Sequence, residues 1–455
     1  MSMKWIQRME EEGETFVFRS VVQEVNVESS LLLYRKARQM FDERCFYWKS
    51  ADEQFAFVGL GEAVTIETNN QTNTRYEEVA TLWEQLLKRH DSPEKSRPIL
   101  FGGFSFDPRQ KISSEWDHFP SATFSVPEIQ WTSREGKEVV AFHAIGTEEE
   151  TTQRLRELQK KWEMIEKAPL QQLKEMPSHL LQERQVDRYE RAVQDTVDKI
   201  RQNEAKKVVI ARSLQLQFED RVPVDTVLQA ISEGQPNSYH FALPYKGSQF
   251  IGATPERLIE VKKGKVLSAC VAGSIRRGAT EEEDEQLGNA LWNDEKNRIE
   301  HDYVVQMIRS VVSNYCTTYD IPQTPEILKI RDIQHLFTPV SGVLKEGVSI
   351  FDWVRELHPT PALGGVPTDV ALNMILQNEQ MDRGYYAAPI GWTDATGDGE
   401  FAVAIRSTLI DDSSAYLYAG GGLVEDSTVQ TEYEETWVKF RPMLRALGGQ
   451  VDELS

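Results

Sequence analysis

Two cations interrupt apolar runs of this 455-residue chain in a way that suggests chemistry. Lys207 begins the run KVVIAR, and Arg406 lies inside FAVAIRSTLI. A charged group among apolar residues loses hydration unless it gains a partner. Burial favours the neutral amine of a lysine, which can act as a base, and an arginine presents a rigid fork of donors that suits a carboxylate. Lys207 is therefore a candidate base and Arg406 a candidate anion-binding residue.

A third candidate is Glu256, which follows a Thr-Pro turn in FIGATPERL. A carboxyl group in a turn between buried strands is a plausible general acid, because burial raises its pKa. Each of these candidates also has a structural alternative. Glu256 could simply pair with an arginine, and Lys207 could form a solvent-exposed pair with Lys206 at the end of a strand.

Two predicted helices carry carboxylates suited to a hard metal ion. Glu300 lies one turn before the apolar stripe of a long helix predicted from Thr280 to Cys316, and a charge there needs a partner. Glu432, Glu435 and Lys439 share one face of the last helix, at spacings of three and four. Two glutamates form the oxygen-rich set that Mg2+ prefers. The alternative is a solvated face on which Glu435 and Lys439 form a surface pair.

Glycine-rich stretches accompany these charged groups. Residues 401–410 and 415–417 read as the two strands of a hairpin, with turn residues at 411–414 between them. The triple glycine at 420–422 removes side chains where the second strand is expected to end, so that a ligand could approach the backbone. Gly421 and Gly422 are therefore candidate substrate contacts.

Three further segments between residues 271 and 367 contribute candidate contacts. In VAGSIRRG, Gly273 and Ser274 offer backbone N–H groups and a hydroxyl. The stretches HLFTPVSGVL (335–344) and LHPTPALGGVP (357–367) are rich in proline and glycine and read as two loops.

The first 180 residues read as mixed in secondary structure and quiet in chemistry, and a helix at 187–203 followed by a strand at 206–218 opens the chemically rich part. We therefore expect residues 1–180 to form a structural half and residues 187–455 the catalytic core. In the first half, a charged helix and a surface connection are expected over 148–185, strands over 14–25, 55–64, 99–106 and 138–144, and a helix over 75–89.

Composition limits the classes of partner. The net charge of −21 argues against nucleic acid and anionic membranes, because binding to phosphates depends on clustered Lys and Arg. Three widely spaced cysteines suggest neither a disulfide framework nor a zinc site, and they fit a reducing cytoplasm. No apolar run is long enough to span a bilayer, and the N-terminus lacks the apolar segment of a signal peptide.

Ten segments together resemble the catalytic core of the chorismate-utilising enzymes, a group that includes isochorismate, salicylate, anthranilate and aminodeoxychorismate synthases. They follow the family's order over residues 207–439, whereas the first 180 residues are similar only in length and strand-rich character. The segments are KVVIAR, ATPERL, AGSIRRG, IEHDYVV, HLFTPVSG, HPTPALGG, RGYYAAPIGW, FAVAIRS, YAGGGLVEDS and EYEETWVK.

The resemblance implies an α/β fold in which two large antiparallel sheets pack face to face with helices outside. It also indicates a branch of the family. Isochorismate and salicylate synthases carry a lysine where Lys207 stands, whereas ammonia-using relatives typically have glutamine. Ala272 replaces the nucleophilic lysine of one aminodeoxychorismate branch. Ala362 and Leu363 in HPTPALGG are more similar to isochorismate synthases than to salicylate synthases.

By the same resemblance, Lys207 would activate water for attack at C2 of chorismate, and Glu256 would protonate the departing C4 hydroxyl. Glu300 and Glu435 would hold Mg2+, with Glu432 in or near its ligand shell. Arg406 and Lys439 would bind a substrate carboxylate. The remaining implied substrate contacts are Gly273, Ser274, His335, Ala362, Leu363, Gly421 and Gly422.

The resulting hypothesis is a cytoplasmic, Mg2+-dependent isochorismate synthase of the menaquinone-pathway type, working without a glutamine amidotransferase subunit. A salicylate synthase and a siderophore-pathway isochorismate synthase remain alternatives within the family. From a different class, a non-catalytic chorismate-binding protein remains open, although every expected catalytic residue is present. A glycine-loop nucleotide-binding enzyme is disfavoured, because no GK[ST] sequence occurs.

Overall fold

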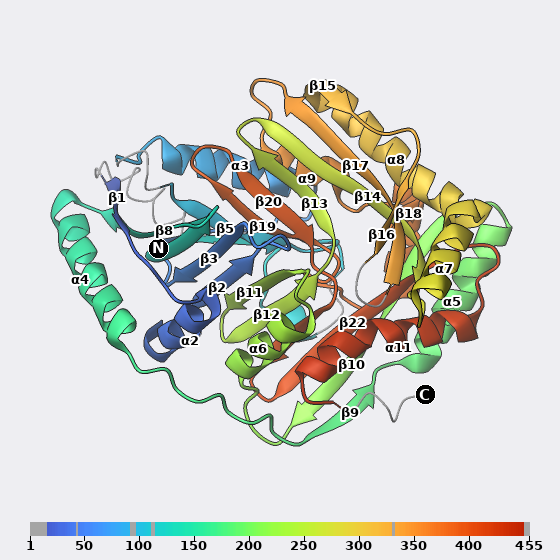
Figure 1. Ribbon diagram of the computed structural model, residues 1–455, viewed down its shortest axis with the longest axis horizontal. Helices are drawn as coiled ribbons and strands as arrows, with labels where there is room; N and C mark the ends of the chain where they lie inside the picture. Colours follow the sequence, from blue (N-terminus) through green and yellow to red (C-terminus); the bar gives the residue numbers. More distant parts are fainter. Residues whose placement is uncertain (1–15, 42–43, 92–96, 111–113, 330–332, 450–455) are drawn as a thin grey trace.

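The computed structural model describes residues 16–41, 44–91, 97–110, 114–329 and 333–449, and describes Glu300 by its backbone alone. Two large antiparallel sheets organise these residues (Figure 1), as expected. The larger sheet has twelve described strands, in the order β1 (Val17–Glu24), β8 (Lys137–Gly146), β7 (Ile129–Arg134), β3 (Phe55–Leu60), β2 (Cys45–Lys49), β11 (Tyr239–Tyr245), β12 (Ser248–Thr254), β21 (Ser407–Asp411), β22 (Ser414–Leu423), β10 (Lys207–Phe218) and β18 (Gly365–Val366), with β9 (His179–Glu183) also paired to β10.

The second sheet has ten described strands and takes its members from both halves of the chain. Its order is β15 (Cys316–Asp320), β17 (Ile333–Leu344), β14 (Lys265–Arg276), β13 (Arg257–Lys262), β20 (Gly399–Val403), β19 (Pro389–Asp394), β5 (Ile99–Phe104), β6 (Ala122–Val126) and β4 (Val64–Thr68), with β16 (Glu326–Lys329) paired to β17.

Helices cover the outer faces of both sheets (Figure 1). On the twelve-stranded sheet these are α2 (Ser30–Phe41), α4 (Glu148–Lys167), α5 (Val186–Arg201), α6 (Val224–Gly234) and α11 (Val429–Ala446). On the ten-stranded sheet they are α3 (Thr74–Leu87), α7 (Glu281–Asn293), α8 (Glu295–Tyr315) and α9 (Ile350–Leu357), while α10 (Thr368–Asn378) packs against β10 and α5. None of these helices is long and apolar enough to cross a membrane.

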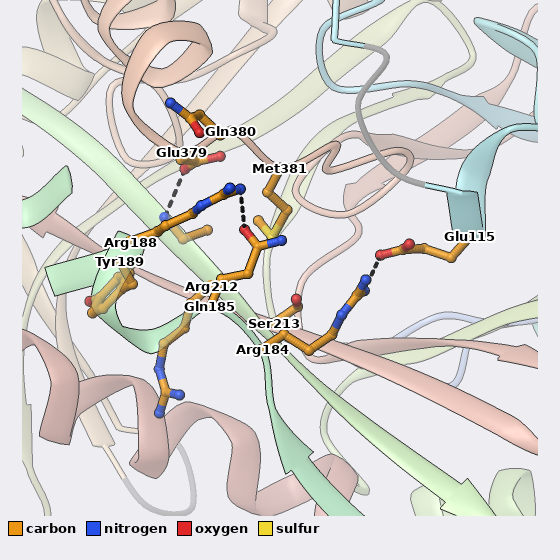
Figure 2. Close-up of a pocket in the computed structure, with 11 residues that line it drawn as sticks. Glu115, Arg184, Gln185, Arg188, Tyr189, Arg212, Ser213, Glu379, Gln380 and Met381 are labelled. Carbon is orange, nitrogen blue, oxygen red and sulfur yellow. Dashed lines mark hydrogen bonds and ion pairs between the residues drawn. The ribbon is translucent and has the colours of Figure 1, made fainter. Parts of the chain in front are cut away.

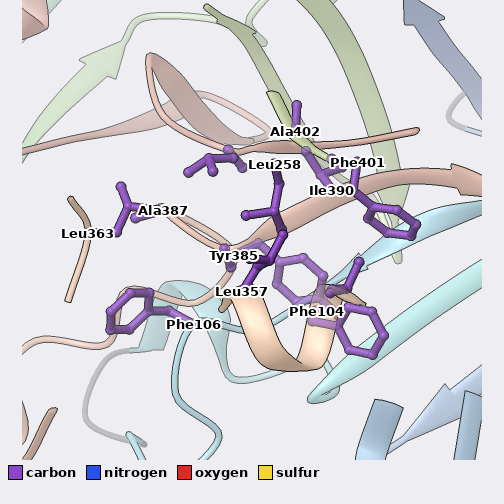
Figure 3. Packing of buried hydrophobic residues seen from close by; sticks show 14 of the residues in the cluster. Phe104, Phe106, Leu258, Leu357, Leu363, Tyr385, Ala387, Ile390, Phe401 and Ala402 are labelled. Carbon is purple, nitrogen blue, oxygen red and sulfur yellow. The ribbon is translucent and has the colours of Figure 1, made fainter. Parts of the chain in front are cut away.

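Aromatic side chains fill the space between the two sheets. Phe101 of β5 lies 5.5 Å from Phe57 and 6.1 Å from both Phe46 and Trp48, measured between ring centroids, and those three rings come from the opposite sheet. Burial of such rings supplies a large share of a core's stabilisation. Figure 3 shows a neighbouring part of this core, where side chains of β5, β13, β19 and β20 pack around Leu357 at the end of α9.

Two of the places where the chain passes from one sheet to the other lie next to each other. One crossing joins β12 to β13 and the other joins β20 to β21; β12 pairs with β21 and β13 with β20. The backbone N–H of Ala253 donates to the carbonyl of Arg406 at 3.0 Å, and that of Val403 donates to the carbonyl of Glu256 at 3.0 Å. The two crossings therefore support each other, and Glu256 and Arg406 belong to one local structure.

This arrangement corrects the hairpin expected from residues 401–410. The segment is two strands in different sheets, and Arg406 between them has a left-handed φ of +50°. Because both strands are buried, the apolar run continues across the crossing, and the sequence pattern does not reveal where one strand ends and the next begins. The hairpin itself is real but joins β21 to β22, and the triple glycine lies inside β22 rather than beyond it.

Three other expectations about elements are wrong. Residues 335–344 belong to strand β17, whose Pro339 is accommodated because β16 pairs with residues 334–337 and β15 with residues 341–344 and neither reaches it. The long helix divides into α7 and α8, because Asp294 is extended and caps α8 by accepting the N–H of Asn297 at 2.7 Å. The connection after α4 contains β9.

Gly102 generates a prediction about stability. A Cβ at this position would lie 2.0 Å from the carbonyl oxygen of Thr123, and its partner across the β5–β19 pair is Gly391, where backbone also approaches closely. Gly102→Ala should therefore lower the free energy of unfolding by about 1–3 kcal/mol, measured by urea denaturation. Gly234→Ala, where a Cβ would meet nothing within 4 Å, is the control; equal unfolding midpoints for both variants would contradict the close packing.

Candidate active site

Lys207 is the first residue of β10 and is only 3% exposed, whereas Lys206 is exposed to solvent. Successive strand residues point to opposite faces, so the two lysines do not form the solvent-exposed pair that the sequence left open as an alternative. The Lys207 side chain crosses the neighbouring strand at Gly422, where a Cβ would lie 2.5 Å from its Cε. A glycine at 422 is therefore what allows this lysine to occupy its position.

Glu256 lies at the crossing between β12 and β13, beside Arg406 at the other crossing. Its backbone N–H donates to the Thr254 hydroxyl at 3.2 Å, which holds the turn. Burial raises the pKa of the Glu256 carboxyl to about 7, although the positive charges of Lys207 and Arg406 both lower it. The structure thus brings an acid, an amine and a guanidinium into one electrostatic group.

A buried ion pair supports the strand that carries Lys207. Arg383 and Glu379 have fully buried side chains and form two hydrogen-bonded contacts, of which the one through Nε is 2.9 Å. Glu379 also accepts the N–H of Ala211 at 2.7 Å, and Arg383 donates to the carbonyl of Val209 at 2.8 Å. The pair therefore bonds to β10 two to four residues after Lys207.

The same arginine fixes the loop that contains Ala362 and Leu363. Arg383 donates to the carbonyl of Leu363 at 3.1 Å, and the backbone N–H of Val209 donates to the carbonyl of Gly364 at 2.9 Å. The loop then enters β18, whose two residues pair with the start of β10. Leu363 is buried and Ala362 is partly buried, and both lie beside the strand of Lys207.

Helix α11 contributes a second group of charges. Glu432 is 8% exposed and accepts the Ser427 hydroxyl at 2.7 Å through Oε1, while its Oε2 is buried with no hydrogen-bond partner among the described residues. Burial raises the pKa of Glu432, and the charge of Glu435 adds to this. Exposed Glu435 pairs with Lys439 at 2.6 Å, and Lys439 also donates to the carbonyl of Gly420 at 2.7 Å.

Strand β22 connects the two groups of charges. Because alternate residues face opposite sides, Gly422 faces Lys207 whereas Gly421 faces α11. A Cβ at Gly421 would lie 2.5 Å from Oε2 of Glu432. The glycines therefore allow the side chains of Lys207 and Glu432 to approach β22 closely from both sides.

Helix α8 approaches this region through its first turns. Lys296 lowers the pKa of Glu432, and Asn297 accepts the N–H of Ser274 at 3.3 Å. The backbone of Glu300 lies one turn further along α8, but its side chain lies outside the described residues. Within the described part of the chain, no three His, Cys, Asp or Glu side chains are grouped closely enough to hold a metal ion.

Ser274 and His335 lie opposite each other on β14 and β17. The Ser274 hydroxyl is hydrogen-bonded to Nδ1 of His335 at 2.7 Å, and Gly273 with a φ of +76° marks a bulge in β14 at this point. The structure therefore brings Gly273, Ser274 and His335 together as a third group, beside the first turn of α8.

A cavity of about 220 Å³ lies elsewhere along β10 (Figure 2). Neither Lys207 nor Glu256 lines it. Its lining includes Glu115, Arg184, Arg188 and Ser213, none of which was expected to be functional from the sequence.

Comparison with known families identifies the family of this chain. A model of a chorismate-binding enzyme family matches residues 4–448, which is nearly the whole chain. The chain belongs to this family. Its position as an enzyme of the chorismate-utilising group, expected from ten short segments, is thereby confirmed.

Two curated relatives of this chorismate-binding enzyme match along most of its length. The isochorismate synthase MenF of Bacillus subtilis is 41% identical over 414 residues, covering 89% of this chain and 88% of the relative. A salicylate biosynthesis isochorismate synthase of Pseudomonas aeruginosa is 34% identical, covering 90% and 86%. The solved structure of the Escherichia coli menaquinone-specific isochorismate synthase matches with a TM-score of 0.79 at 21% identity, covering 98% and 99%, and this supports the fold.

Several positioning residues of this chorismate-binding enzyme escaped the sequence interpretation. Glu379 and Arg383 lie in the connection after α10, where nothing in the sequence indicates that their charges are buried or paired. Ser427 and Asn297 carry no such signal, because their roles depend on contacts between distant segments.

The raised pKa of Glu256 predicts a dependence of stability on pH. The folded carboxyl titrates near pH 7 and an unfolded one near about 4.3, so the folded state binds more protons between these values. The contribution of Glu256 to the free energy of unfolding should therefore fall as pH rises from about 4 to about 7. Urea denaturation should show that the free energy of unfolding of the wild type falls relative to that of Glu256→Gln as pH rises through this range. A difference between the two proteins that does not depend on pH would contradict the raised pKa.

Proposed function

We propose that this enzyme is an isochorismate synthase that converts chorismate to isochorismate. The observation that carries the proposal is the placement of Lys207 and Arg406 close enough to Glu256 to alter its pKa, at the crossing of the two sheets. The 41% identity to an isochorismate synthase over most of both chains supports the same activity. Position 207 is a lysine, as in the isochorismate and salicylate synthases that this chain resembles, whereas the ammonia-using members of the family typically have glutamine there. This difference supports water as the nucleophile.

In the proposed reaction, Lys207 and Glu256 act on opposite ends of one displacement. The Lys207 amine takes a proton from water as the water oxygen forms a bond to C2 of the ring. The C1=C2 electrons move to form C1=C6 and the C5=C6 electrons move to form C4=C5. The bond between C4 and its hydroxyl oxygen breaks, and Glu256 donates the proton with which that hydroxyl leaves as water. A pKa near 7 keeps a substantial fraction of Glu256 protonated at neutral pH.

The remaining residues would bind the two carboxylates of chorismate. Arg406 offers a guanidinium beside Glu256, and its donors suit a carboxylate. Lys439, Gly421 and Gly422 would supply further contacts from α11 and β22. On the other side, Ser274 and His335 would contact the substrate with Gly273, and Ala362 and Leu363 would pack against it.

The acidic residues of α11 fit a divalent cation. The buried Oε2 of Glu432 has no hydrogen-bond partner among the described residues, and Glu435 lies close enough to raise the pKa of Glu432. Glu300 on α8 would complete the set proposed here for Mg2+, since all three offer the hard oxygen ligands that this ion prefers. When bound, Mg2+ would supply positive charge for a substrate carboxylate, and the engagement of Glu435 would release Lys439.

We also propose a cytoplasmic enzyme of the menaquinone pathway that uses water and needs no glutamine amidotransferase subunit. The described cysteines Cys45, Cys270 and Cys316 are buried and form no disulfide with one another, which fits a reducing compartment. The Bacillus subtilis relative named MenF supports the pathway.

The role of Lys207 is tested by a pair of adjacent variants. Lys207→Ala should lower kcat by roughly a hundredfold to ten-thousandfold while chorismate still binds, because the base is lost but the proposed carboxylate contacts remain. Lys206→Ala should keep near-normal turnover, since its side chain is exposed on the opposite face. Chromatography of the products identifies isochorismate directly.

Two results would contradict this assignment. Salicylate with pyruvate, or an aminated product when ammonium is supplied, would show another branch of the family. Full turnover by Lys207→Ala would remove the water-activating role.

The metal proposal is tested by binding as well as by activity. Glu435→Gln should weaken Mg2+ binding measured by calorimetry and raise the Mg2+ concentration needed for turnover, because a hard anionic ligand is lost. The control is Glu434→Gln, whose exposed side chain is hydrogen-bonded to Gln430 on the same helix. Unchanged Mg2+ affinity in Glu435→Gln, or full activity with excess chelator, would overturn the metal assignment.

A further inference from the structure

The cavity of about 220 Å³ lies along the edge of β10 between β18 and β9 (Figure 2). Strand β18 pairs with β10 at residues 207–208 and β9 pairs with it at residues 214–218, so the edge between them carries neither neighbour. The first turn of α5, the end of α10 and Glu115 close the cavity around this edge. Its lining is separate from every residue assigned above to chorismate or to Mg2+.

Three buried polar atoms of the lining residues have no hydrogen-bond partner among the described residues: Oε2 of Glu115, the Tyr189 hydroxyl and Nη2 of Arg212. Glu115 is 4% exposed; its Oε1 accepts from Arg184 at 2.5 Å and from the Tyr418 hydroxyl at 3.4 Å, but its Oε2 has no partner among the described residues. Ser213 is also 4% exposed, and its hydroxyl adds a further polar group to the lining. Buried polar groups are seldom left unpaired, so the three unpartnered atoms favour a polar occupant.

The opposite wall of the cavity is positive. Arg188 donates to the side chain of Gln185 at 3.2 Å, an uncharged partner, and its side chain is exposed at the cavity. Gln185 begins α5 in a left-handed conformation and makes no side-chain cap. The positive end of the α5 dipole and the Arg188 guanidinium therefore face the same space, which suits a carboxylate.

We propose that this cavity binds a small hydroxylated monocarboxylate. Its carboxylate would bond to Arg188 at the start of α5, one hydroxyl would donate to Oε2 of Glu115, and another would bond to the Ser213 hydroxyl. Ala211 and Met381 provide an apolar surface for the carbon frame. A dianion fits less well, because the buried carboxylate of Glu115 would repel its second charge.

The cavity also touches the support of the strand that carries Lys207. Glu379 lines it and accepts the N–H of Ala211, and the same carboxylate pairs with Arg383. An occupant would therefore lie against the ion pair that fixes β10. Binding at this site does not depend on the proposed reaction and can be measured without turnover.

Calorimetry with shikimate, a cyclic trihydroxy monocarboxylate, tests the proposal. Wild-type protein should bind shikimate with a stoichiometry of one, and cyclohexanecarboxylate, which lacks the hydroxyls, should bind at least tenfold more weakly. Arg188→Gln and Ser213→Ala should each weaken shikimate binding by roughly tenfold or more, as expected for lost hydrogen bonds to charged or buried groups. Arg201→Gln is the control, because Arg201 lies at the other end of α5 and pairs with Asp198.

The test must also distinguish shikimate binding in the cavity from shikimate binding in the candidate active site. Arg406→Gln should leave shikimate binding unchanged if the cavity is occupied. Three results would each overturn the proposal. They are the absence of shikimate binding to folded wild-type protein, binding by both Arg188→Gln and Ser213→Ala that is as tight as that of the wild type, and a loss of binding confined to Arg406→Gln. Matching urea midpoints for the variants exclude unfolding as the cause of any loss.

Discussion

The buried ion pair between Arg383 and Glu379 is the interaction on which the candidate active site depends most. Two charges without solvent contact are costly unless each finds partners. Here the partners are backbone groups of Val209, Ala211 and Leu363, so the pair replaces the missing neighbour strand along part of β10. Loss of either side chain would leave a buried charge, at a cost of about 3–5 kcal/mol.

The second constraint is the pair of crossings between the sheets. Their mutual backbone hydrogen bonds place Glu256 beside Arg406, and the first residue of β10 brings Lys207 to the same place. The acid is therefore held by backbone connections that also hold the sheets together. Its carboxyl stays in a partly buried setting that keeps its pKa high, although two cations lie near it.

Much of this was accessible from the sequence, for identifiable reasons. The alternation of Lys206 and Lys207 follows from strand geometry, and the Thr-Pro turn before Glu256 marks the end of β12. The crossing at Arg406 was not accessible, because β20 and β21 are both buried and the apolar pattern continues through it. Strand β17 was read as a loop, since its proline is tolerated only through a gap between β15 and β16 that lies elsewhere in the chain.

The contacts of α11 show a similar limit. Spacings of three and four placed Glu432, Glu435 and Lys439 on one face, but not the burial of Glu432 against Gly421 or the bond from Lys439 to Gly420. These contacts depend on a glycine strand that was expected to end earlier. Pattern alone locates chemically capable residues, whereas the approach of distant segments decides which of them meet.

The most direct test of the proposed chemistry is turnover of chorismate in water labelled with heavy oxygen. If Lys207 activates water for attack at C2 while Glu256 assists departure of the C4 hydroxyl, mass spectrometry of isochorismate should show one labelled oxygen per molecule, located at C2. Unlabelled isochorismate would contradict the account, because the hydroxyl at C2 would then have come from the substrate itself.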